Sequence, residues 1–126
     1  MHTANVDQYK GEAYAIRALC YFNLVRYFGK PFAEDPNALG VPIVTTYNPD
    51  DKPTRAKVSD VYNLMIADLE KAYSLMTKYT NSSQFSKYAA KGLQAKVYLT
   101  KGDNTNALTA ALDVINNGGF TADTAA

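Results

Sequence analysis

The chain has 126 residues, enough for one hydrophobic core but not for two, and 47% of them are hydrophobic against 20% charged. This balance excludes a disordered chain, and a net charge of +1 gives no field that would attract nucleic acid or an anionic membrane. No run reaches the roughly 20 apolar residues of a membrane-spanning helix, and the opening residues resemble neither a secretory signal nor a lipidation site. We therefore expect residues 1–126 to form a single domain, soluble as given, without a lipid anchor of its own.

The first predicted helix runs from about Asn5 to Phe28 and is apolar on nearly every face, so other elements must cover it. Cys20 is expected to pack on this helix as a small hydrophobic residue. Arg17 lies among apolar neighbours, where a guanidinium needs a partner, and we expect it to anchor the next loop through backbone carbonyls rather than to bind a ligand. An apolar stripe at helical spacing contains Ile16, Cys20, Leu24 and Tyr27.

The segment 29–57 holds all five prolines and predicts a long loop. Within it, Val41–Thr45 is extended, and Pro42 favours an edge position over an interior strand. Asp50 and Asp51 follow an Asn-Pro pair, which favours a solvated turn over a calcium site. Loops of nearly thirty residues are uncommon in compact domains. This one is either functional or lies across another part of a larger protein.

The second predicted helix, about 58–78, has the clearest amphipathic spacing in the chain. Its polar residues, such as Asp60 and Glu70, are expected to face away from the core. A polar connector, 80–84, follows. The apolar positions of this helix are Val58, Val61, Tyr62, Met65, Leu69, Ala72, Tyr73 and Met76.

Two further helices are predicted at about 86–101 and 104–117. Ser86 and Asp103 are their expected N-caps, and Gly102 ends the earlier of the two. Gly118–Gly119 is expected to end the last helix through a left-handed residue, with Phe120 folding back. The apolar stripe of the earlier helix contains Ala90, Leu93 and Val97. That of the last helix contains Leu108, Ala111, Leu112 and Ile115.

Small and aromatic residues in the last two helices follow the spacing of a tetratricopeptide repeat. Lys91 and Gln94 stand where that repeat expects Trp and Leu, and Ala18 and Tyr21 echo the spacing in the first helix. The predicted fold class is therefore all-α: two tetratricopeptide-like antiparallel helix pairs, about four helices, with a long inserted loop after the first. A chance match of short Ala/Tyr patterns is the alternative. The matching positions are Ala95, Tyr98, Gly102 and Ala107.

No residue is predicted to be catalytic, to bind a cofactor or to ligate a metal, and we expect no enzyme. Nucleophilic catalysis needs a base beside a Ser or Cys, and the sole histidine, His2, lies at the chain start. Asp68 and Glu70 point roughly 200° apart on a helix and do not converge. No Cys/His cluster and no glycine-rich phosphate loop is present.

Ten tyrosines could provide stacking platforms for sugar rings. Tyr47 in the loop and Tyr79 at a helix end are the free candidates, and the ligand-binding residues stay unknown. Four tyrosines lie at core-facing helical spacings and are expected to pack: Tyr21, Tyr62, Tyr73 and Tyr98.

Five blocks over residues 11–121 resemble, in order, the SusD/RagB family. Phe85 and Gln94 depart from it, since the family usually has Arg and Leu there. The first block, 11–32, is similar to the family's E-A-x-x-x-R-A-x-x-Y-F-x-L-x-x-x-F-G-x-x-P pattern. The others are Gly40–Thr45 (G-V-P-L-V), Arg55–Leu69 (R-x-x-V-x-x-x-Y-x-x-I-x-x-D-L), Ser86–Leu99 (S-K-x-A-A-x-x-x-L-A-x-V-Y-L) and Gly102–Gly118.

The resemblance implies an excised central part of a longer cell-surface lipoprotein, anchored in the outer membrane, that binds glycans or other nutrients. Its implied partner is a SusC-like TonB-dependent transporter, which the helical repeats would face. The loops outside this stretch would contact the sugar. The alternative is a free-standing tetratricopeptide module that binds a peptide in its concave groove. A stand-alone module would have little use for the inserted loop.

Overall fold

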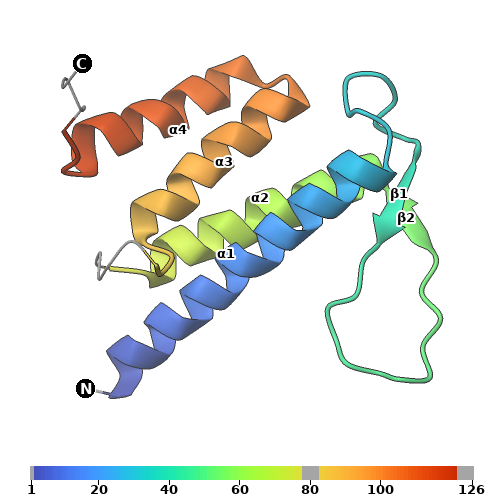
Figure 1. Cartoon of the computed structure of the whole chain (residues 1–126), viewed down its shortest axis with the longest axis horizontal. Coiled ribbons are helices and arrows are strands. Elements are labelled where there is room, and N and C mark those ends of the chain that lie inside the picture. The colour runs from blue at the N-terminus through green and yellow to red at the C-terminus, as the bar shows by residue number, and fades with distance from the viewer. Residues whose placement is uncertain (1, 78–82, 122–126) are drawn as a thin grey trace.

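The computed structural model describes residues 2–77 and 83–121, with side chains from residue 5 on. Four helices and two short strands make up this part of the chain (Figure 1). Each helix packs on the next along the chain, and α1 also touches α3, as in a stack of helix pairs. The all-α prediction with two helix pairs is confirmed. The elements are α1 (His2–Phe28), β1 (Leu39–Pro42), β2 (Arg55–Lys57), α2 (Val58–Leu75), α3 (Lys87–Lys101) and α4 (Asn104–Asn117).

The core lies mainly between α1 and α2. Gly11 leaves room for the end of α2, because a Cβ atom there would lie 2.5 Å from Cγ of Met76. The predicted apolar face of α2 is confirmed, with Tyr73 half-buried and the rest buried, although the helix ends at Leu75, three residues earlier than expected. From α1 the core takes Ala15, Ala18, Tyr21, Phe22 and Val25.

The predicted stripe on α1 is wrong as a packing face. Ile16 is 51% exposed, Tyr27 is 79% exposed, and Cys20 and Leu24 are exposed as well. The small residues Ala15 and Ala18 lie on the opposite side of α1 and let α2 approach closely. This side of α1 is therefore the buried one. The apolar stripe therefore faces away from α2.

Arg17 is structural, as expected, but its predicted partner was wrong. It forms a bidentate ion pair with Asp68 on α2, with Nε–Oδ2 and Nη2–Oδ1 distances of 2.7 Å each. The Asp68 side chain is 3% exposed. Hydrogen bonding to Asp68 raises the pKa of Arg17, against the opposing effect of burial. The ion pair thus links the first and second helices, not the first helix and the loop.

Tyr21, not Arg17, anchors the loop to α1, and Arg55 joins the two strands within the loop. Arg55 donates to the carbonyls of Gly40 (2.7 Å) and Leu39 (2.8 Å). The Tyr21 hydroxyl accepts from the amide of Val44 (2.8 Å) and donates to its carbonyl (3.2 Å). The Tyr21 contacts hold Val44 near α1 and the Arg55 contacts hold β2 beside β1, whereas the chain between Val44 and Arg55 projects away from the helices (Figure 1).

The loop also contains a small antiparallel sheet. Leu39 pairs with Lys57 and Pro42 with Arg55, with an irregularity in the register between them. The predicted extended segment Val41–Thr45 overlaps only the end of β1, and β2 was not predicted. Pro42 is the last residue of β1. Because the sheet has two strands, β1 is an edge strand, in agreement with the preference of proline for edges.

The predicted caps of α3 and α4 are confirmed. The Ser86 hydroxyl accepts from the amide of Ala89, and the Asp103 carboxylate accepts from that of Asn106. Gly102 adopts φ 93°, the left-handed conformation that ends α3. Gly119, with φ 73°, follows α4.

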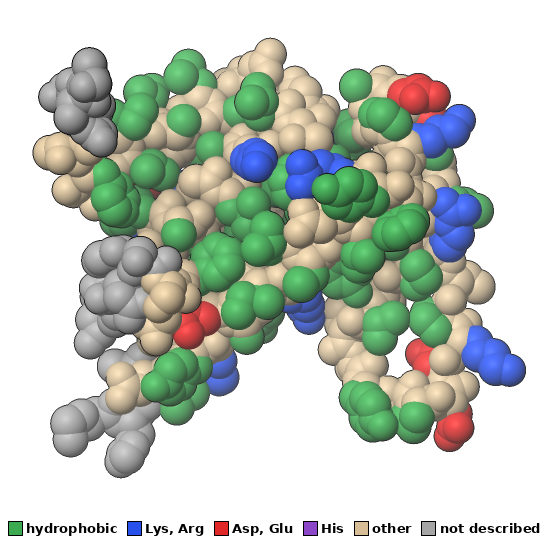
Figure 2. Space-filling model, viewed as in Figure 1, with side chains coloured by type: hydrophobic (Ala, Val, Ile, Leu, Met, Phe, Trp, Pro, Cys, Tyr) green, Lys and Arg blue, Asp and Glu red, His purple; other side chains and the backbone are tan. Residues whose placement is uncertain are grey.

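The apolar stripe of α4 is not a packing face among the described residues. Leu108 and Ile115 are 61% and 68% exposed. Ala107 and Ala110 are the residues of α4 that are buried, against α3. In the space-filling view, hydrophobic side chains are spread over α4 and over the centre of the molecular surface that faces the viewer (Figure 2).

Candidate functional site

The residues singled out for chemistry do not converge. Cys20 is exposed on α1, and no group of three potential metal ligands occurs among the described residues. Asn48 accepts from the amide of Asp50 and from that of Asp51, which makes this segment the predicted turn. The side chain of His2 lies outside the described residues.

Tyrosines divide into packing and exposed residues. Tyr21 and Tyr62 are buried, as predicted, and burial raises the pKa of Tyr62 above its ordinary value. Tyr73 and Tyr98 are half-buried. Tyr47, at 93% exposure, is free as predicted. Tyr79 lies outside the described residues. The sequence did not separate out two other exposed rings, both on α1, Tyr9 and Tyr27.

A polar cleft of about 190 Å³ lies where α2, α3 and α4 meet. Gln94, 1% exposed, donates to Glu70 on α2 (2.8 Å) and accepts from Lys91 (3.0 Å). Burial, and then the charges of Glu70 and Asp103, raise the pKa of Tyr98. The Gln94 side chain therefore joins α3 to α2 through Glu70 and pairs with Lys91 within α3.

Tyr73 of α2 contacts two residues that line this cleft, Lys91 and Asp113. The Nζ atoms of Lys87 and Lys91 lie 4.5 and 4.2 Å from its ring centroid, and the ring of Tyr88 meets it edge-on. Burial, followed by hydrogen bonding to Asp113, raises the pKa of Tyr73. Hydrogen bonds from Asn117 and then Tyr73 lower the pKa of Asp113. Side chains of three helices are thus tied to one another here.

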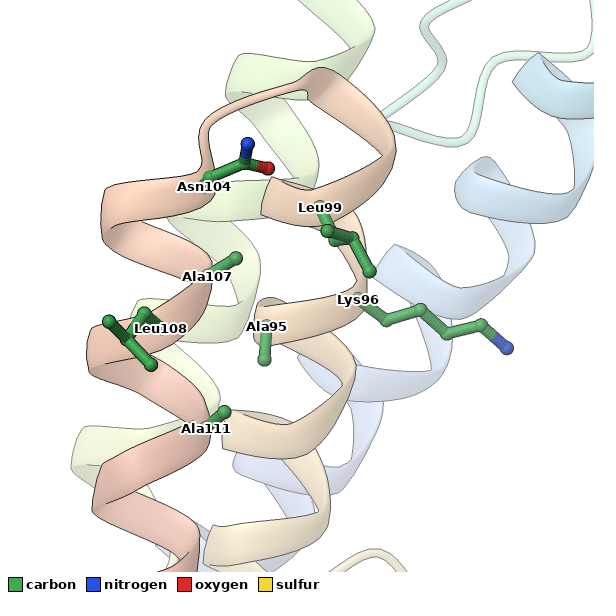
Figure 3. Close-up of a pocket in the computed structure, with 7 residues that line it drawn as sticks. All are labelled: Ala95, Lys96, Leu99, Asn104, Ala107, Leu108 and Ala111. Atoms are coloured by element: carbon green, nitrogen blue, oxygen red, sulfur yellow. The ribbon is translucent and has the colours of Figure 1, made fainter.

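An apolar groove of about 400 Å³ runs between α3 and α4. Ala95, Ala107 and Ala111 point into the gap between the helices, and Leu108 and Lys96 extend from its two sides (Figure 3). The small residues keep the groove open, and the exposed leucines make its rim apolar. Such a surface suits packing against another helix rather than catalysis.

A basic pocket of about 370 Å³ lies on α1 and is lined by Lys10, Ala13, Tyr14 and Arg17. The guanidinium of Arg17 lies 5.4 Å from the Tyr14 ring centroid, and Nζ of Lys71 on α2 lies 5.3 Å from it. Sequence reasoning missed this pocket and the ion pair beneath it. The available signal was that Asp68 falls on the apolar face of α2, one helical turn after Met65.

The described residues thus form a stack of four packed helices with a small two-stranded sheet. No helix in the described part of the chain has the length and apolar character needed to cross a bilayer. A family model described as "Starch-binding associating with outer membrane" matches residues 1–99. The chain belongs to this SusD-like family.

Individual relatives agree with this assignment. The chain is 31% identical to SusD-like protein P38 of Formosa agariphila, over 93% of this chain and 22% of that protein. It is 30% identical to a SusD-like protein of Bacteroides ovatus, over 86% of this chain and 21% of the relative. The sequence therefore spans about a fifth of these relatives' length.

Solved structures share the fold. A SusD superfamily protein of Bacteroides thetaiotaomicron matches with a TM-score of 0.88 and 39% identity, over 93% of this chain and 26% of that one. A laminarin-binding SusD-like protein matches with a TM-score of 0.76 and 29% identity, over 98% of this chain and 26% of that one. The loop and both helix pairs thus belong to a fold found inside longer proteins.

Proposed function

We propose that residues 1–126 are one helical domain of a longer SusD-like protein that captures glycans or related nutrients at the outer membrane. In this proposal the domain is a scaffold and not an enzyme. A lipid anchor elsewhere in the longer protein would hold it at the cell surface, and the helical repeats would face a SusC-like TonB-dependent transporter. Family membership and the roughly four- to fivefold greater length of the relatives support this assignment.

The observation that carries the scaffold role is how the aromatic side chains are used. A sugar site combines an aromatic platform with several fixed polar groups in one concavity. Phe22 and Tyr62 are instead buried in the core, and Tyr73 is covered by two lysines. Tyr47 is exposed but stands on the projecting loop, and it lines none of the three cavities described above.

Exposed apolar faces at both ends of the helix stack also support a scaffold. Repeat proteins bury such faces by stacking further units, and terminal units need a polar outer side. Here the outer sides carry Ile16 and Tyr27 on α1 and Leu108 and Ile115 on α4. These faces suit contacts with other parts of a longer polypeptide.

Direct titration tests the scaffold role. Calorimetry of the chain with starch, laminarin, pectin and mannan oligosaccharides should show no heat of specific binding, because the exposed Tyr47 lines none of the three cavities and the Tyr14 ring of the basic pocket is already contacted by two cations. Tyr27→Ala, also an exposed tyrosine, is the control variant for Tyr47→Ala. A micromolar dissociation constant abolished by Tyr47→Ala but not by Tyr27→Ala would contradict the proposal.

A further inference from the structure

The loop between α1 and α2 contains an exposed arm, residues 45–54. The chain is anchored in the core as far as Ile43 and again from Ala56 on, because both side chains pack against the core cluster. Every residue from Val44 to Arg55 is exposed. Figure 1 shows this stretch as a wide bow that extends away from the helices. The position of the arm therefore depends on how its two ends are held.

The hydrogen bonds within the arm are local. Asn48 accepts from the amide of Asp51 through its carbonyl (3.2 Å) and from the amide of Asp50 through its side chain (3.1 Å). Pro49 and Pro53 fix the backbone φ angle at two positions. In the described part of the chain, no hydrogen bond or ion pair joins the arm to a helix. The arm thus has a stiffened tip, but its direction is not fixed along its length.

The end of the arm at Arg55 is held by several independent contacts. The Arg55 guanidinium donates to the carbonyls of Gly40 (2.7 Å) and Leu39 (2.8 Å), and β2 pairs with β1. At the start of α2, the amide of Val58 donates to the carbonyl of Ala38 (2.9 Å). The loss of any one contact leaves the others in place, so this end can act as a hinge.

The end at Val44 is held by a single side chain. The Tyr21 hydroxyl accepts from the Val44 amide (2.8 Å) and donates to the Val44 carbonyl (3.2 Å). Tyr21 is only 8% exposed in the α1–α2 core, which keeps its hydroxyl in place. Because both hydrogen bonds use the same oxygen atom, we expect them to form and break together.

We propose that Tyr21 is the latch of a hinged arm. When its two hydrogen bonds to Val44 break, residues 45–54 swing about the β1–β2 pair, and the helices keep their packing. Two hydrogen bonds contribute far less than the core, so the arm opens locally and much more often than the chain unfolds. All parts of this device lie within the described residues. It gives the scaffold one movable element, and the exposed Tyr47 moves with it.

The chain allows two probes to be placed specifically for this motion. Cys20 is exposed on α1 and is the sole cysteine, and the sequence has no tryptophan. Tyr47→Trp therefore adds a single fluorescence donor, and an aminonaphthalene sulfonate group on Cys20 is the acceptor. Time-resolved energy transfer should give a narrow distance distribution. Tyr21→Phe keeps the ring but removes the latch oxygen, and it should increase the open fraction about tenfold, as expected for two lost hydrogen bonds.

Amide hydrogen exchange tests the latch without labels. In the unmodified chain, the Val44 amide should exchange faster than the Val58 amide at the hinge. Tyr21→Phe should accelerate exchange at Val44 by about tenfold and leave Val58 unchanged. Tyr62→Phe is the matched control, because it removes the hydroxyl of another core tyrosine, 2% exposed, that does not contact Val44. It should change neither the exchange rates nor the distance distribution.

Three results would overturn the proposal. The first is a distance distribution that Tyr21→Phe leaves unchanged. The second is equal acceleration at Val44 and Val58 in that variant, which would mean that the whole fold had loosened. The third concerns the unmodified chain and needs no variant: exchange at Val44 as slow as at Val58 would show that the arm does not open locally.

Discussion

Truncating Phe22 to alanine is expected to lower the free energy of unfolding by about 4 kcal/mol, within the range for phenylalanine deletions in cores. Phe22 is 1% exposed and lies in the α1–α2 core. Its ring also stacks under the guanidinium of Arg26, 4.1 Å from the ring centroid. The substitution therefore leaves a cavity and removes a cation–π contact. Urea unfolding followed by circular dichroism measures the change.

Phe28→Ala is the matched control, because it removes the same side chain from the same helix. Phe28 is 70% exposed, and its truncation should change the free energy of unfolding by no more than about 0.5 kcal/mol. Similar losses for the two variants would mean that the buried side of α1 has been assigned wrongly.

Replacing Arg17 with alanine is expected to cost about 3 kcal/mol, the lower end of the range for breaking a buried ion pair. The loss comes mainly from Asp68, whose side chain is 3% exposed and would keep a charge without a partner. The Arg17 side chain is itself 32% exposed, so water can replace part of the lost contact. Thermal and urea unfolding at pH 7 measure the change.

The double variant Arg17→Ala/Asp68→Ala should be more stable than Arg17→Ala alone, because it removes the stranded carboxylate. Asp51→Ala, at an exposed turn position, is the control for loss of an acidic side chain. A melting temperature unchanged by Arg17→Ala would contradict the structural role of the ion pair. If the affinity for a partner collapsed at the same time, Arg17 would belong to a binding site.

Helix α2 could be predicted almost residue by residue because its apolar side chains occupy one face only. Helix α1 could not, because apolar residues surround it and hydrophobicity alone does not tell Ile16 from Phe22. Packing decided the outcome: Ala15 and Ala18 allow two backbones to approach, which larger residues prevent. Because α2 packs on the side of Ala15 and Ala18, the apolar stripe on the other side of α1 stays exposed.

The sequence positions of Arg17 and Asp68 already indicated that these two residues could form an ion pair. Arg17 has apolar neighbours on α1, and Asp68 lies on the apolar face of α2 between Met65 and Ala72. Two lone opposite charges on two apolar faces are each expensive to bury unless they meet. Pairing such residues across predicted helices would have located the contact, whereas the assignment to loop carbonyls considered Arg17 alone.

The strands and the basic pocket were harder to predict. β2 has only three residues, Arg55–Lys57, too few for a periodic signal. Arg17, which lines the pocket, is oriented by Asp68 of α2, and that contact depends on how the two helices are placed. The polar cleft depends likewise on three helices meeting at Gln94, which the repeat pattern marked only as a departure.

A chimera tests the scaffold claim most directly. The chain would replace the matching segment of the laminarin-binding SusD-like protein, to which it is 29% identical over 98% of its own length. If this domain supports the sugar site without contributing to it, the folded chimera should bind laminarin with an affinity within about threefold of the parent, a difference below about 0.7 kcal/mol. A chimera with the parent's circular-dichroism spectrum and cooperative melt that no longer binds laminarin would contradict the account.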